Sequence, residues 1–70
     1  MVTTEQILEY IERVIAEDRL SGNRAGLRNT QLAAGFLMNA ARAAGDNETA
    51  RKFQLLAAQA ANKSEELERR

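Results

Sequence analysis

The sequence predicts an all-α fold, an antiparallel three-helix bundle that forms a single helical domain over residues 1–70. Composition favours helices, because proline is absent, glycine occurs only four times and alanine, the strongest helix former, is abundant. Apolar residues recur at steps of three and four positions, which is the spacing of a helix that buries one side. Two short glycine-containing segments divide the chain and predict helices over about residues 4–20, 25–44 and 47–68.

The first predicted helix has signals at both ends. Thr3 or Thr4 precedes it as a capping residue, and Gln6 completes a capping box with Thr3. The apolar stripe consists of Ile7, Leu8, Ile11, Val14 and Ile15. Tyr10 flanks this stripe and is expected to be half buried, while Gly22 suits the left-handed conformation that ends a helix. The pattern is typical of an amphipathic helix with one buried side.

The second predicted helix begins after Asn23, a suitable N-cap residue, and is apolar on two sides. At about 100° per residue, one side gathers Leu27, Ala34, Leu37, Met38 and Ala41. The roughly opposite side gathers Leu32, Phe36, Ala40 and Ala43. Such a helix must be covered twice, either as the central helix of the bundle or by another molecule. The simplest interpretation places Met38 and Phe36 in the core.

The third predicted helix follows Gly45, which suits a C′ position, and is capped by Asp46 or Asn47. Its buried stripe is expected to contain Ala50, Phe53, Leu56, Ala57, Ala60, Ser64 and Leu67. Leu55 falls well outside this stripe and adds to the surplus of apolar surface. Both connections are short, so consecutive helices are expected to be antiparallel neighbours.

Composition also excludes several kinds of chemistry. The chain has no Cys and no His, which removes disulfides, thiolate metal sites, the commonest metal ligand and the usual general base. No catalytic residue, metal ligand or cofactor is predicted, and an enzyme is the least expected class. No apolar run approaches the roughly 20 residues of a transmembrane helix. The start lacks the basic and apolar regions of a signal peptide, so a cytoplasmic location is expected.

Charge is balanced overall but uneven along the chain. Residues 1–20 carry five acids against Arg13 and Arg19, a balance of −3, whereas residues 21–44 carry three arginines and no acid, a balance of +3. The simplest interpretation is an acidic helix lying beside a basic one. The more specific alternative is that the basic segment forms a docking surface. Because the net charge is zero, binding to nucleic acid is not favoured.

Two resemblances to helical families follow from short motifs. Residues 45–50, with Ala57 after them, resemble the turn and second helix of one tetratricopeptide hairpin. The second resemblance rests on an acidic pair (Glu17 and Asp18), a Gly-Asn turn (Gly22 and Asn23) and a leucine (Leu27), which follow one another along the chain. Together with three antiparallel helices, this succession resembles the MIT (microtubule-interacting and transport) domain over nearly the whole chain. The resemblance implies binding of short helical tails of membrane-remodelling proteins, in a groove of helices 2 and 3 near Leu32, Phe36, Leu55 and Gln59.

The leading hypothesis from the sequence is a small non-catalytic protein-interaction module. It would present an apolar groove between helices 2 and 3 to a partner protein or peptide helix. The expected partner-binding residues are Leu32, Phe36, Leu55, Ala58 and Gln59. One alternative is a self-associating, homodimeric accessory or inhibitor protein that buries the same apolar surface. A small DNA-binding regulator is the third hypothesis, and it predicts affinity that falls steeply with salt.

Overall fold

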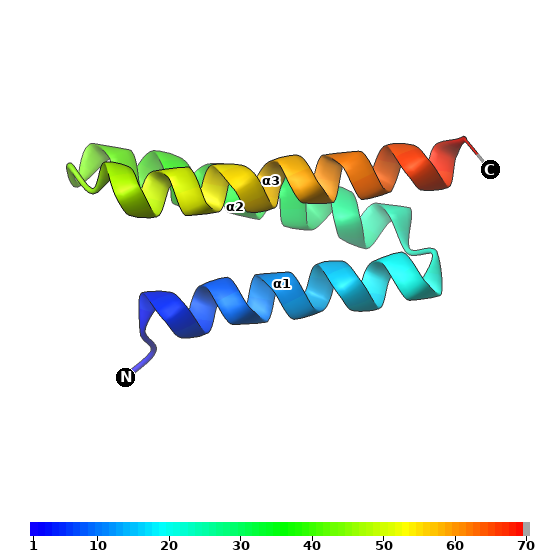
Figure 1. Cartoon of the computed structure of the whole chain (residues 1–70), viewed down its shortest axis with the longest axis horizontal. Coiled ribbons are helices and arrows are strands. Elements are labelled where there is room, and N and C mark those ends of the chain that lie inside the picture. The colour runs from blue at the N-terminus through cyan, green and yellow to red at the C-terminus, as the bar shows by residue number, and fades with distance from the viewer. Residues whose placement is uncertain (70) are drawn as a thin grey trace.

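A computed structural model describes residues 1–69 of the chain. Within that range the protein forms three helices and no strand: α1 (Thr4–Ser21), α2 (Arg24–Ala43) and α3 (Asn47–Glu68). Helices α2 and α3 run antiparallel and make the most extensive contact, while α1 packs along both (Figure 1). The predicted all-α three-helix bundle is confirmed, and each helix boundary lies within one residue of its expected position.

Each helix begins at a side-chain cap that the local sequence supplies. The Thr3 hydroxyl accepts a hydrogen bond from the Gln6 backbone amide at 3.2 Å, and the Thr3 amide donates to the Gln6 side chain at 2.9 Å. The predicted capping box is therefore confirmed. Asn23 caps α2, and Asp46 caps α3 by accepting from the Thr49 amide at 3.1 Å. The Thr49 hydroxyl and amide both donate to Asp46 and hold the pKa of its carboxyl below the ordinary value.

The first two helices end in the same backbone motif. Gly22 and Gly45 adopt left-handed φ angles of 72° and 79°, as predicted. The residue after each glycine donates its backbone amide five positions back, to the carbonyl oxygens of Asp18 and Ala41 at 2.8 and 2.9 Å. These hydrogen bonds satisfy carbonyl groups that the end of a helix otherwise leaves unpaired. The two tight turns they produce make consecutive helices antiparallel.

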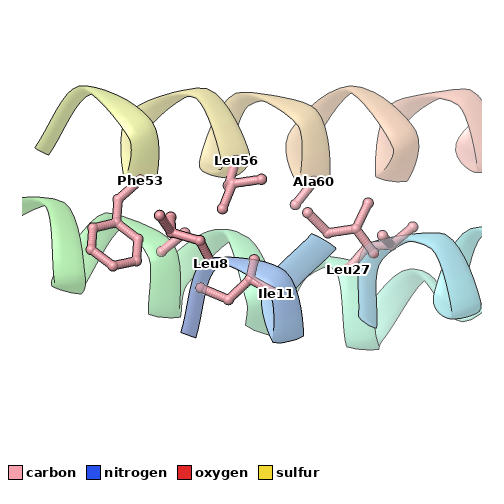
Figure 2. Packing of buried hydrophobic residues seen from close by; sticks show 8 residues of the cluster. Leu8, Ile11, Leu27, Phe53, Leu56 and Ala60 are labelled. Carbon is pink, nitrogen blue, oxygen red and sulfur yellow. The ribbon is translucent and has the colours of Figure 1, made fainter. Parts of the chain in front are cut away.

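The core lies where the three helices meet. Its buried residues are Leu8, Ile11, Ile15, Leu27, Ala34, Phe53, Leu56 and Ala60. Figure 2 shows Phe53, Leu56 and Ala60 projecting from α3 toward Leu8 and Ile11 of α1. Small side chains at Ala34 and Ala60, both without exposed surface, allow α2 and α3 to approach closely.

The structure corrects the expectation that Phe36 belongs to the core. Its side chain is 75% exposed, whereas Met38 is half buried and packs against the core. Ala34 on the same helix has no exposed surface and marks the direction of the core. Phe36 lies two positions further along, about 200° around the helix, and therefore points away. Consequently α2 is covered on only one of its two apolar sides by the rest of the described chain.

Two glycine substitutions are expected to change stability in opposite directions. A Cβ added at Gly22 or at Gly35 meets no atom within 4 Å, so only the backbone conformation distinguishes the two positions. Gly35 lies inside α2, where Gly35→Ala is expected to raise the free energy of unfolding by about 0.5–1 kcal/mol. Gly22→Ala is expected to lower it by about 1–2 kcal/mol, because alanine is strained at positive φ. Urea denaturation of both variants checks this, and a shift in the same direction for both would contradict it.

Candidate functional site

Exposed large apolar side chains identify the candidate binding surface. They are Met1, Val2, Tyr10, Leu20, Leu32, Phe36 and Leu55. Single residues of this kind are ordinary on protein surfaces, but a contiguous group is not. Leu32 and Phe36, which are 66% and 75% exposed, lie one turn apart on the same side of α2. This pair is therefore the starting point of the site.

Alanines extend the pair into a continuous apolar strip along α2. We call this strip the outer face of α2, and it consists of Leu32, Ala33, Phe36, Ala40 and Ala43, all exposed. Helical geometry places these residues on one side, because each lies three or four positions from another member of the strip. Leu32 and Phe36 project from this strip, and the small alanine side chains beside them leave a flatter apolar surface.

A hollow between α1 and α2 borders the outer face. It is lined by Tyr10, Ile11, Val14, Asn29, Thr30 and Ala33, none of which is charged. Ala33 belongs to both features, so the hollow and the outer face form one surface. Tyr10 is 58% exposed, and the guanidinium carbon of Arg13 lies 5.4 Å from the centroid of its ring. This cation–π contact helps to hold the ring at the edge of the hollow.

The side of α2 that faces α3 away from the core is polar. One hollow there is lined by Arg42, Asn47, Glu48, Ala50, Arg51 and Gln54. Another, at the opposite end of the two helices, is lined by Arg24, Ala25, Arg28, Ser64 and Glu68. Side chains of this kind do not form the apolar groove that the sequence predicts between helices 2 and 3.

The structure separates the five predicted binding residues. Leu55 and Gln59 line a hollow between α1 and α3, to which α2 contributes no residue. Leu32 and Phe36 lie on the outer face of α2, and Ala58 is exposed on α3. The five residues therefore do not share one groove. The periodicity of a single helix shows which of its residues share a side, but it does not show which neighbour that side meets.

Tyr10 and Ala33 are among the residues of this surface that the sequence did not predict to belong to it. The sequence places Tyr10 at the flank of the first helix and says nothing of Ala33. Ala33 follows Asn29 by one turn and precedes Phe36 by three positions, so it lies on the margin of the apolar side. Only the packing of α1 against α2 brings Tyr10 and Ala33 together.

Ion pairs do not join the acidic helix to the basic one. Arg19 pairs with Glu66 and Lys52 with Glu5, which joins α1 to α3 at 3.9 and 3.7 Å. The remaining two pairs are Arg24–Glu68 at 3.9 Å and Lys63–Glu66 at 3.5 Å. Within residues 1–69 no ion pair connects α1 to α2. Since at least one partner of each pair is exposed, each pair contributes at most about 1 kcal/mol to stability.

Other kinds of site find no support in the described part of the chain. In residues 1–69 no three acidic side chains are grouped so that they could hold a metal ion. None of the helices α1–α3 contains a stretch long and apolar enough to cross a membrane. Comparisons with protein-family models, with curated proteins and with solved structures found no match. The outer face of α2, with the adjoining hollow, is therefore the candidate binding surface.

Proposed function

We propose that the chain is a non-catalytic protein-interaction module that binds a partner helix along the outer face of α2. The observation that carries the proposal is the exposure of Leu32 and Phe36 as neighbours on a helix whose opposite side is buried. The MIT-like resemblance predicts the same class of function, although it places the groove between helices 2 and 3. That resemblance remains a prediction.

The energetics favour a helical partner. Full burial of a leucine or phenylalanine side chain stabilises a complex by about 1.5–3 kcal/mol. A helix laid along α2 can contact both anchors at once and place its own apolar residues, spaced by three and four positions, over the alanines between them. Part of the same partner can enter the hollow beside Tyr10, which is lined by apolar and uncharged polar side chains. A bundle of four helices would result.

Phe36→Asp is expected to abolish binding of helical peptides while the fold is retained. The binding partner is obtained by panning a displayed library of amphipathic helical peptides against the protein. For the peptides that are enriched, Phe36→Asp is expected to weaken affinity at least about 100-fold, because an apolar anchor is lost and a carboxylate is desolvated. Isothermal titration calorimetry measures the affinity, and circular dichroism reports whether helicity is unchanged.

Leu55→Asp is the matched control for this experiment. Leu55 is 62% exposed, which is similar to Leu32, but it lies on α3 in the hollow shared with α1. Its replacement is expected to leave affinity for the selected peptides within about twofold, since it lies off the proposed surface. If Leu55→Asp abolishes binding and Phe36→Asp does not, the binding surface lies between α1 and α3 instead. If no enriched peptide depends on either residue, the proposed function is wrong.

A further inference from the structure

We infer that the partner is an acidic amphipathic helix, whose carboxylates meet arginines at the margins of the outer face of α2. This inference rests on the proposed function and specifies its partner. Residues 22–45 contain Arg24, Arg28 and Arg42 but no aspartate or glutamate. The exposed apolar strip of α2 therefore belongs to a segment whose charges are all positive.

The arginines lie where they can meet a helix docked on the outer face. Arg28 precedes Leu32 by one turn, and Arg42 lies near the other end of the strip; both are on the margin toward α3, where they line polar hollows. Both are exposed, and neither forms an ion pair within residues 1–69. Arg13 lies against the other side of this surface: it contacts the Tyr10 ring but lines a separate hollow of α1 together with Glu9.

Most acidic side chains of the neighbouring helices lie elsewhere. Glu5, Glu9 and Glu12 of α1 line the hollow on the side of α3, where Glu5 pairs with Lys52. Glu48 and Glu68 share polar hollows with Arg42 and Arg28 but do not come within ion-pair distance of them. The exceptions on the side of α2 are Glu17, two turns after Tyr10, and Asp18, whose carboxylate lies against Gly26 at the start of α2 and accepts a hydrogen bond from the Asn23 side chain at 3.4 Å. The margin of the outer face thus has unpaired positive charge that a partner can neutralise.

Two other occupants fit this charge less well. A second copy bound through its own outer face would bring the arginines of one α2 against those of the other, with no acid from either helix. Like charges that face each other across an interface weaken binding, so association of two copies through this face is disfavoured. An acidic lipid surface would attract the arginines but would also meet α1, whose residues 1–20 have a charge balance of −3. The carboxylates of an acidic helix can pair with the arginines while its apolar residues cover the strip, without contact with the acidic residues of α1.

Two synthetic peptides of about 18 residues test the inference. Both carry leucines at intervals of three and four positions, and their flanking positions hold glutamate in one peptide and lysine in the other. Fluorescence anisotropy at low salt is expected to show about tenfold tighter binding of the glutamate peptide, consistent with two exposed ion pairs. Added salt is expected to reduce that preference, since screening weakens exposed charge pairs.

Charge reversal on the protein supplies the decisive comparison. The double variant Arg28→Glu with Arg42→Glu is expected to bind the lysine peptide more tightly than the glutamate peptide. The control double variant, Arg19→Glu with Arg69→Glu, changes the net charge equally at exposed positions away from the outer face. It is expected to keep the original preference.

The following results would each overturn the inference, and they differ in what they mean for the proposed function. Equal binding of the two peptides, or selection of neutral peptides that still require Phe36, removes the acidic preference and leaves the proposed function standing. Light scattering that shows a dimer abolished by Phe36→Asp assigns the outer face to a second copy of the chain. Binding to vesicles containing acidic lipid, lost on reversal of Arg28 and Arg42 and without binding of either peptide, assigns it to a membrane surface and overturns the proposed function too.

Discussion

Leu27→Ala is expected to lower the free energy of unfolding by about 3–5 kcal/mol, which is the range for a leucine truncated in a close-packed core. Leu27 is the largest side chain without exposed surface, and it packs where α2 leaves its first turn and meets the core. A domain of this length is expected to have a total stability of about 3.5–10 kcal/mol. The variant is therefore expected to lose a large share of its stability and to unfold at a markedly lower temperature and urea concentration, as measured by circular dichroism and urea denaturation.

Leu32→Ala provides the control on the same helix. The substitution removes the same atoms, but Leu32 is 66% exposed and leaves no cavity. Its effect on the free energy of unfolding is expected to stay within about 0.5 kcal/mol. Equal losses for the two variants would mean that the outer face is already covered in solution, and a light-scattering measurement of the molar mass would identify a second copy as its cover.

Phe53→Ala is expected to cost about 3–5 kcal/mol, because it removes the only buried aromatic ring in the described chain. The ring projects from α3 into the core (Figure 2). Thermal unfolding followed by circular dichroism measures the loss.

Phe36→Ala is the corresponding control for Phe53→Ala. The same atoms are removed from a ring that is 75% exposed, so stability is expected to change by no more than about 0.5 kcal/mol. Affinity for the selected helical peptides is expected to fall in this variant even though its unfolding curve is unchanged. If Phe36→Ala destabilises the protein as much as Phe53→Ala does, the assignment of Phe36 to the surface is wrong.

Local interactions explain why the sequence predicts the helices so closely. The cap of each helix is a hydrogen bond between residues three positions apart, as in Thr3 with Gln6 and Asp46 with Thr49. The turns at Gly22 and Gly45 depend on backbone conformations that glycine adopts without strain. Such features are contained within a few consecutive residues, so they are readable without knowledge of the rest of the fold.

The tertiary structure alone decided which side of α2 is covered and what lies beside each exposed residue. The sequence shows that α2 is apolar on two sides, but both Phe36 in the core and Phe36 on the surface agree with its periodicity. The choice depends on how three helices pack at once around Ala34 and Ala60, which are separated along the chain and meet only when α3 folds back. For the same reason Leu55 shares a hollow with α1 rather than α2. By itself the sequence determined the helices, their caps and the surplus of apolar surface, whereas long-range packing decided where that surplus is exposed.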